Sequence, residues 1–467
     1  AYHCDGGLHV APATGSSTGR ALVASDEPSV TWGLSDFAHA EELARMRSFW
    51  WATDSESLLV ARVDAAPVQE ISMADPAQPS QPAMSMRYPF AGSANVRTSL
   101  WHIRLDGSRD EIMTERDVDE YLVDVTWRPG RPALISVLDR DQRRWRVLSW
   151  EPSRHPVLVR DVRDPSWVDV VAGAPTWWGE RLVTVEVDEQ SDTARVYLNG
   201  VPASPPGMQV QAILAAEDAA VLVAVSEHER ERRVARMGAD GSWSMLTPAG
   251  CLGTAQAAGD TVVTRVDPRD AVVPTVTVST PQATHPMAVH VVAPDVTPAP
   301  MFLPRADAAD PRVAVLLPSV PHPGPLPVLL DPYGGPHGQR VVDAARAYLE
   351  SQWWADQGFA VVVAEGPGTP GSPRWQRAMS GEVAGPALTA QVRALEMVSK
   401  ALGDEIDMAR VAIRGWSFGG YLAALAVLER PDVVHAAIAG APVTDWALYD
   451  TAYTERYLGL PQEHPGR

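Results

Sequence analysis

Short apolar runs separated by turn residues dominate the first 280 positions of the chain. After residue 50 these runs show no long helical period, and several end in Asp-Gly, Asn-Gly or Glu-Pro turns. The strand-like runs begin roughly 40 to 50 residues apart, at 100–105, 145–150, 194–198 and 233–237. Four short strands in that length are typical of one β-propeller blade. The spacing therefore predicts a β-propeller, because a β-sandwich, the alternative, would not repeat in this way over so long a span.

Two stretches depart from this strand pattern. Residues 35–47 carry helix-forming side chains, with Ser35 or Asp36 as N-cap candidate and two adjacent carboxylates, Glu41 and Glu42. We expect a short helix there, inserted between blades. The stretch 281–311 is rich in Pro and Ala, and we place a domain boundary within it, near residue 300.

Beyond this boundary the pattern changes to buried strands that alternate with helices. The clearest helix ends at Gly403 and carries one apolar face. Such alternation predicts a mainly parallel α/β sheet. The expected strands are 327–331, 359–364, 411–414 and 434–439, and the expected helices are 341–357, 386–402 and 421–428.

Composition and charge exclude several classes of protein. Apolar residues make up 45% of the 467 positions and charged residues 21%, which is typical of a folded globular chain. No apolar run reaches the roughly 18–20 residues of a membrane-spanning helix. The net charge of −19 offers no basic footprint for nucleic acid and favours cationic ligands. The two cysteines, Cys4 and Cys251, form no disulfide framework or zinc spacing, and we expect no metal and no cofactor.

The strongest chemical motif is the G-x-S-x-G pattern at residues 415–419. It lies between a predicted strand and a predicted helix, which is where a nucleophile elbow places its serine. There the sharp turn holds Ser417 in disfavoured backbone angles, and the helix that follows aims its amide dipoles at a developing oxyanion. The alternative is an ordinary tight turn. We therefore expect a β-propeller in residues 1–299, followed by an α/β-hydrolase domain in residues 300–467 with Ser417 as nucleophile.

The elbow and four further blocks together resemble the dipeptidyl peptidase IV branch of the prolyl oligopeptidase family. The elbow itself reads Gly-Trp-Ser-Phe-Gly-Gly-Tyr, and the matches span roughly residues 33 to 461. The other blocks are Ala-Glu-Glu-Leu at 40–43 with Phe-Trp-Trp at 49–51, the Arg-Tyr-Pro-Phe-Ala-Gly-Ser-Ala-Asn run at 87–95, Asp-Pro-Tyr-Gly-Gly-Pro-His at 331–337, and the run that begins Tyr-Asp-Thr-Ala-Tyr at 449–453.

This resemblance implies a role for each matching residue. Tyr333 would donate its hydroxyl to the oxyanion beside the backbone N–H of Phe418, unless it is only a packed tyrosine of the turn. Glu41 and Glu42 would bind the terminal ammonium of a peptide, although adjacent carboxylates are more often a solvated helix face. Arg456 would lie near the substrate. The small apolar pocket for the penultimate residue would be lined by Phe418, Val443, Trp446, Tyr449 and Tyr453, which could equally be core residues.

The chain also departs from the family pattern. Glu365 and Pro367 stand where the family usually carries Asp and Arg, a change for which the sequence offers no physical account. The triad Asp and His of the family lie well over 60 residues past the serine, whereas His435 and His464 lack the expected context. We count about five blades where the family has about eight. By comparison with the family, we therefore expect the β-propeller and the α/β-hydrolase domain both to be incomplete. The chain would be a fragment of a longer peptidase that is inactive by itself, with no triad Asp or His on this chain.

Together these expectations describe a serine peptidase that releases N-terminal dipeptides through an acyl-enzyme on Ser417. It would prefer Pro or Ala at the penultimate position and act on oligopeptides with a free N-terminus. The alternatives are an aminoacyl-releasing or endo-acting relative, and a non-catalytic propeller or pseudo-enzyme. We further expect no nucleic-acid partner, no membrane span, a possible homodimer and a cytoplasmic location.

Overall fold

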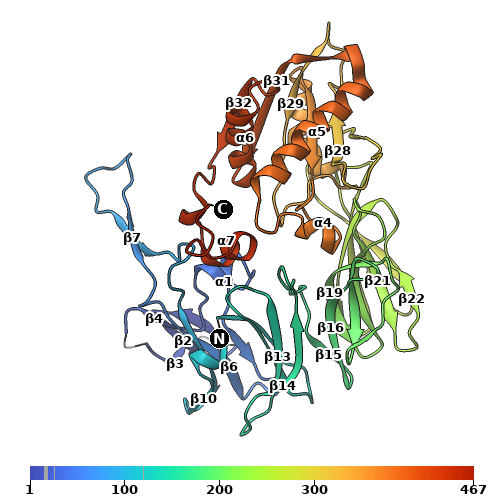
Figure 1. Ribbon diagram of the computed structural model, residues 1–467. Helices are drawn as coiled ribbons and strands as arrows, with labels where there is room; N and C mark the ends of the chain where they lie inside the picture. The colour runs from blue at the N-terminus through green and yellow to red at the C-terminus, as the bar shows by residue number, and fades with distance from the viewer. Residues whose placement is uncertain (15–18, 26, 119, 467) are drawn as a thin grey trace. The chain divides into compact units, whose positions relative to one another are not determined.

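The computed structural model describes residues 1–14, 19–25, 27–118 and 120–466 (Figure 1). The chain forms two compact units. The first contains residues 1–170, 175–177 and 445–467, and the second contains residues 171–174 and 178–444. None of the helices in these described ranges is both long and apolar enough to cross a membrane.

The first unit consists mainly of antiparallel sheets. Its three sheets have the orders β1-β2-β3, β10-β9-β6-β4 with β5 paired to β6, and β11-β12-β13-β14, and a separate hairpin joins β7 to β8. The strands are β1 (Tyr2–Cys4), β2 (Gly7–Val10), β3 (Arg20–Val23), β4 (Val30–Trp32), β5 (Phe49–Trp51), β6 (Ser57–Asp64), β7 (Glu70–Met73), β8 (Met84–Arg87), β9 (Arg97–Arg104), β10 (Arg109–Met113), β11 (Tyr121–Thr126), β12 (Ala133–Leu138), β13 (Arg144–Trp150) and β14 (Val157–Arg163). Its helices are α1 (Phe37–Glu41), α2 (Glu115–Val118), η3 (Trp446–Leu448) and α7 (Thr451–Leu458).

Three further four-stranded antiparallel sheets follow along the chain, with the orders β15-β16-β17-β18, β19-β20-β21-β22 and β23-β24-β25-β26. The predicted strands at 145–150, 194–198 and 233–237 fall within β13, β17 and β21, and the one at 100–105 extends one residue past the end of β9, so the repeat is confirmed. The strands are β15 (Thr176–Trp178), β16 (Arg181–Asp188), β17 (Thr193–Leu198), β18 (Val201–Pro202), β19 (Gln209–Glu217), β20 (Ala220–Ser226), β21 (Arg233–Gly238), β22 (Trp243–Met245), β23 (Cys251–Ala258), β24 (Thr261–Pro268), β25 (Thr275–Ser279) and β26 (Thr284–Met287).

Alternating side chains of these strands form the cores. In the second sheet of the first unit, Leu59, Ala61 and Val63 of β6 share one cluster with β12, while Leu58 and Val60 face another cluster. This alternation is the two-residue period of a strand that is buried on both faces. The repeating sheets therefore bury their apolar positions on both sides, as stacked blades do.

The last part of the second unit is an α/β layer built on a six-stranded sheet of order β27-β28-β30-β29-β31-β32 (Figure 1). The pairs β29–β30, β29–β31 and β31–β32 are parallel, as predicted, and β27–β28 and β28–β30 are antiparallel. Helix α5 packs against β28, β30 and β31, and α6 packs against β31 and β32. The strands are β27 (Met301–Phe302), β28 (Arg312–Leu316), β29 (Leu326–Leu330), β30 (Ala360–Glu365), β31 (Ile406–Trp416) and β32 (Ala436–Gly440), and the helices are η1 (Ala345–Tyr348), α3 (Leu349–Asp356), α4 (Pro373–Arg377), α5 (Ala384–Leu402), η2 (Gly403–Glu405) and α6 (Phe418–Glu429).

The last strand of the antiparallel sheets, β26, and the first strand of the α/β sheet, β27, lie on either side of the boundary predicted near residue 300. The division into a domain of residues 1–299 and one of residues 300–467 stays a prediction.

Two helices are shorter than the sequence predicts. The helix expected over 35–47 is only α1, because the chain turns at Ala44, whose φ is 52°, and the N–H of Arg45 binds the carbonyl of His39. The helix expected over 341–357 begins as η1 at Ala345. Its first N–H groups are bound elsewhere, that of Val341 by Glu365 and that of Val342 by the Tyr348 hydroxyl. The Tyr348 hydroxyl also donates to the Val342 carbonyl at 3.0 Å, an acceptor that a first helical turn would use, so these hydrogen bonds take the place of that turn.

Candidate active site

The strand-to-helix turn between β31 and α6 holds Ser417 in the strained conformation that the sequence predicts. Its φ of 54° and ψ of −119° are unusual for a residue with a side chain and cost of order 1–3 kcal/mol. The surrounding backbone fixes the turn, because the Ser417 N–H donates to the Gly440 carbonyl at 3.0 Å and the Tyr421 N–H donates to the Ser417 carbonyl at 2.9 Å. Such a turn presents a serine side chain at the end of the strand, ahead of the first turn of a helix.

Close backbone packing explains the glycines of this motif. A Cβ atom on Gly419 would lie 2.6 Å from the carbonyl oxygen of Pro332, and one on Gly420 would lie 2.3 Å from that of Gly440. A Cβ on Gly415 would lie 2.1 Å from the carbonyl oxygen of Gly419. All three distances are shorter than any normal contact, so the elbow can close only with glycine at these positions.

Tyr333 lies in the loop that follows β29, beside the elbow. Its ring lies 6.1 Å from that of Phe418, centroid to centroid. Phe418 is 2% exposed and also contacts the ring of Tyr421, while a Cβ on Gly335 would collide with the Phe418 ring at 2.4 Å. The Phe418 side chain is therefore a core group, and its backbone N–H is the part that a role at Ser417 would use.

In the first unit, α1 presents the two adjacent glutamates at its C-terminal end. Asp36 caps the helix by accepting from the N–H of Ala38, which identifies it as the N-cap, while the Ser35 hydroxyl binds Ser48 instead. Glu41 is the last helical residue and is exposed, whereas Glu42 is the C-cap and is half-buried. The two carboxylates are thus in different environments, which their adjacency in the sequence does not reveal.

Glu42 is a carboxyl that resists ionisation. Burial, the charge of Asp450, a hydrogen bond with Asp450 and the charge of Glu41 raise the pKa of Glu42 to about 9, although Arg456 acts in the opposite direction. Asp450 is fully buried and caps α7 by accepting from the N–H of Tyr453 at 2.9 Å. Burial also raises the pKa of Asp450. The pair forms a carboxyl cluster that a positively charged group would stabilise in its ionised form.

Three of the predicted pocket aromatics pack against one another beside this cluster. The rings of Trp446 and Tyr453 are stacked at 5.8 Å with planes 5° apart, and Tyr449 contacts each edge-on at 6.0 and 5.2 Å. Tyr453 is buried at 6% exposure, and Trp446 and Tyr449 are half-buried. The group thus offers a partly exposed aromatic surface at the start of α7.

Loops of the β11–β14 sheet fix α7 in place. Arg140 binds both oxygens of Glu455 at 2.7 Å, and the side-chain amide of Gln142 donates to the Ala452 carbonyl at 2.6 Å. Arg456 donates to Gln142 at 3.0 Å and pairs with Asp169. Arg456 is therefore held by protein partners and contributes positive charge near Glu42.

The predicted site residues divide between the two units. Glu41, Glu42, Trp446, Tyr449, Tyr453 and Arg456 belong to the first unit, and Ser417, Tyr333, Phe418 and the half-buried Val443 belong to the second. The two histidines that lacked family context have other contacts. The Nδ1 atom of His435 accepts from the N–H of Val411 at 3.1 Å, and the His464 ring lies against Gly459.

No role for two residues, Asp450 and Glu365, was identified from the sequence. Asp450 could have been found as a helix N-cap, since it directly precedes a helical pattern. Glu365 was noted only as a departure from the family, and the structure places it fully buried against the backbone of residues 340 and 341. Nothing in the structure explains Pro367.

Comparisons with known proteins agree with this arrangement. Residues 1–224 match the family model described as the dipeptidyl peptidase IV N-terminal region, and residues 346–466 match that of the prolyl oligopeptidase family. Dipeptidyl peptidase 8 of Homo sapiens is 38% identical over 141 residues, which are 30% of this chain and 16% of that protein. The probable dipeptidyl-aminopeptidase B of Uncinocarpus reesii is 37% identical over 145 residues, or 30% of this chain and 15% of that protein. The matched part thus spans less than a fifth of these relatives.

Solved structures extend the likeness to nearly the whole chain. Dipeptidyl peptidase 4 of Porphyromonas gingivalis superimposes with a TM-score of 0.84 at 22% identity, covering 96% of this chain and 67% of that one. A putative dipeptidyl aminopeptidase IV of Bacteroides ovatus gives 0.81 at 19% identity, covering 96% and 69%. The predicted fold class, a β-propeller followed by an α/β-hydrolase domain, and the predicted family resemblance are confirmed.

Proposed function

We propose that this chain is part of a serine peptidase that releases dipeptides from free N-termini, because it matches the model of the dipeptidyl peptidase IV N-terminal region over residues 1–224 and that of the prolyl oligopeptidase family over residues 346–466. The observation that carries the proposal is the conformation of Ser417, with a φ of 54° between β31 and α6. A strained serine at that turn, surrounded by glycines that no other residue could replace, supports nucleophilic catalysis better than a structural turn.

The chemistry is acyl transfer. The Ser417 hydroxyl oxygen attacks the carbonyl carbon of the second residue, and its proton passes through a general base to the leaving amine. The negative oxygen of the tetrahedral intermediate accepts hydrogen bonds from the Tyr333 hydroxyl and the Phe418 N–H. Water then hydrolyses the acyl-enzyme and releases the dipeptide. We do not assign the base to His435, whose ring is bound to the β31 backbone.

The carboxylates at the end of α1 provide the reason to propose an exopeptidase. A terminal ammonium that leaves water needs acceptors and negative charge around it, and the carboxyl groups of Glu41 and Glu42 would supply them, Glu42 most strongly in its ionised form. The aromatic surface of Trp446, Tyr449 and Tyr453 would take a small penultimate side chain such as that of Pro or Ala. A homodimer and a cytoplasmic location remain predictions.

The experiment is a product analysis with the full-length protein. A decapeptide with Pro at position two is incubated with wild type and with Ser417→Ala, and the products are identified by mass spectrometry, with the N-acetylated peptide as control. The proposal expects the N-terminal dipeptide from the free peptide alone and no product with Ser417→Ala. Release of a single residue would assign an aminopeptidase, cleavage at an internal proline would assign an endopeptidase, and the absence of any product would favour a pseudo-enzyme.

A further inference from the structure

A buried carboxylate, that of Glu365, binds the backbone at the far end of the loop that carries Tyr333. This loop runs from the end of β29 to the start of η1. Glu365, the last residue of β30, accepts hydrogen bonds from the backbone N–H groups of Arg340 and Val341, the latter at 2.8 Å. These N–H groups have no helical partners, because the helix begins only at Ala345. Without the carboxylate, two N–H groups of the loop would have to find other acceptors.

The loop is also tied at its base, through the side chain of Arg340. That guanidinium donates to the Asp331 carbonyl at 2.7 Å and to its carboxylate at 3.0 Å. Asp331 lies two residues before Tyr333, and it accepts a further bond from Ser351 at 2.7 Å. Glu365 therefore fixes the backbone of Arg340, whose side chain in turn fixes the start of the loop.

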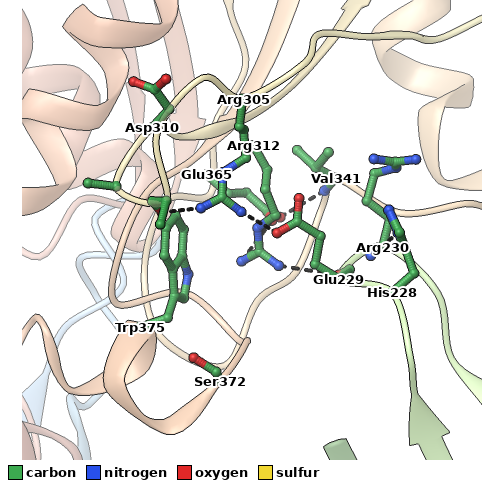
Figure 2. A network of polar contacts seen from close by, with 12 residues as sticks. His228, Glu229, Arg230, Arg305, Asp310, Arg312, Val341, Glu365, Ser372 and Trp375 are labelled. Carbon is green, nitrogen blue, oxygen red and sulfur yellow. Dashed lines mark hydrogen bonds and ion pairs between the residues drawn. The ribbon is translucent and has the colours of Figure 1, made fainter. Parts of the chain in front are cut away.

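Arg312 holds the Glu365 carboxylate in this position. Both side chains are almost completely buried, and they form an ion pair at 3.5 Å. Arg312 also donates to the Thr369 hydroxyl at 2.8 Å and to the Pro370 carbonyl at 2.7 Å, and its guanidinium lies over the Trp375 ring at 5.2 Å. Figure 2 shows this cluster, with Val341 at its edge. The Arg312 guanidinium is thus fixed by several partners, and it lies beside the Glu365 oxygen that does not bind the loop.

We propose that Glu365, clamped by Arg312, is a positioning residue that sets the place of the Tyr333 hydroxyl. This inference rests on the proposed function, in which that hydroxyl stabilises the oxyanion. Glu365 itself is on β30. It binds the backbone at the far end of the loop, and it acts on Tyr333 through that backbone. Its place in the structure also gives a physical account of a glutamate at this position, because its carboxylate has to meet both N–H groups and Arg312.

Two conservative variants of Glu365 distinguish the effect of its hydrogen bonds to the loop from the effect of its negative charge. Glu365→Gln keeps an oxygen that can accept from both N–H groups but loses the ion pair, and Glu365→Asp keeps the charge but withdraws the carboxylate by one methylene. A displaced oxyanion donor lowers kcat more than it changes KM. We expect kcat to fall about 10- to 100-fold in Glu365→Asp and to stay within about threefold of wild type in Glu365→Gln, with KM little changed in both.

The chain offers a closely matched control in Asp310. This buried carboxylate also accepts from two backbone N–H groups, those of Ala306 at 3.1 Å and Asp307 at 3.0 Å, and from an arginine, Arg393, at 2.9 Å. It belongs to the turn before β28. Asp310→Ala should therefore lower the melting temperature but leave kcat of the folded protein unchanged.

The assay uses two substrates with the full-length protein, an Xaa-Pro amide and p-nitrophenyl acetate. The ester requires the nucleophile and the oxyanion donors but no recognition of an amine. In the double variant Tyr333→Phe/Glu365→Asp, kcat should be no lower than in Tyr333→Phe alone, because the second change acts through a hydroxyl that is already absent. A melting curve of each variant gives the fraction of folded protein, and kcat is calculated per folded molecule.

The outcomes separate this inference from the proposed function. Equal kcat in wild type and Glu365→Asp, or additive losses in the double variant, would overturn the positioning role. A second result is that Glu365→Asp slows ester hydrolysis as expected, in a protein that releases no dipeptide. That result would support the positioning role and would contradict the proposed function. A wild-type protein that hydrolyses neither substrate overturns both. If Glu365→Asp does not fold, loss of activity in a folded Glu365→Gln variant counts against the proposal.

Discussion

Replacing Glu42 by Gln should have an effect that depends strongly on pH. Burial, followed by the charge and hydrogen bond of Asp450, raises the pKa of Glu42 to about 9, so this carboxyl holds its proton through neutral pH. Glutamine has the shape of the protonated acid and never ionises. The variant therefore resembles wild type at low pH, and the two should diverge as rising pH ionises Glu42.

The magnitude follows from the ionised fraction. With a pKa of about 9, about 1% of Glu42 is ionised at pH 7 and about half at pH 9. An ionised acceptor strengthens the hydrogen bond to an ammonium by about 1.5–3 kcal/mol, a factor of about 10 to 150. The ratio of wild-type to Glu42→Gln kcat/KM should then be about 1.1 to 2.5 at pH 7 and about 6 to 76 at pH 9.

The assay measures kcat/KM for an Xaa-Pro amide at several values between pH 6 and 9.5 in both proteins. The substrate's own amine loses its proton in this range, but the ratio between the two proteins removes that effect, because both see the same charged fraction. An N-acetylated amide is the substrate control, and Glu56→Gln, at an exposed position between β5 and β6, is the variant control. Neither control should show a ratio that changes with pH.

Two results would refute this reasoning. A large ratio that stays constant from pH 6 to 9 would mean that Glu42 is ionised throughout, so that its pKa is not raised. Equal losses on the free and acetylated substrates would mean that α1 is structural, and amine recognition by its carboxylates would be abandoned.

Three further changes test other parts of the two units. Tyr333→Phe should lower kcat about 10²- to 10³-fold with little change in KM, and a raised KM at constant kcat would assign Tyr333 to substrate binding instead. Asp450→Asn should keep the cap of α7 but move the acidic limb of kcat/KM to lower pH, since it removes one cause of the raised Glu42 pKa; an unmoved limb would leave burial and the charge of Glu41 as the causes. Gly419→Ala should cost about 1–3 kcal/mol of stability, because its Cβ would lie 2.6 Å from the Pro332 carbonyl; an unchanged melting curve would show that the elbow has room.

Much of the local structure could be read from the sequence because the signals are local. The apolar runs with their turn residues located β9, β13, β17 and β21 correctly, and the strand, G-x-S-x-G motif and helix located the elbow with its strained Ser417. Asp36 was one of two predicted N-caps, and it does cap α1. In each case the residues that determine the structure lie within a few positions of one another, so a pattern along the chain reports them.

Only the tertiary structure decided the properties that depend on distant residues. Glu42 appears in the sequence as half of a solvated acidic pair. In the fold, burial, followed by the charge and hydrogen bond of Asp450 from the other end of the chain, raises the pKa of Glu42 to about 9. The helix after β29 starts later than the sequence predicts because the Val342 carbonyl, which a first turn would use as an acceptor, instead accepts from the Tyr348 hydroxyl. The N–H groups of Arg340 and Val341 meanwhile donate to Glu365. Burial and the low polarity of the interior strengthen such contacts, and both exist only once the chain has folded. The sequence determined which groups were available, and the packing determined their charge and their partners.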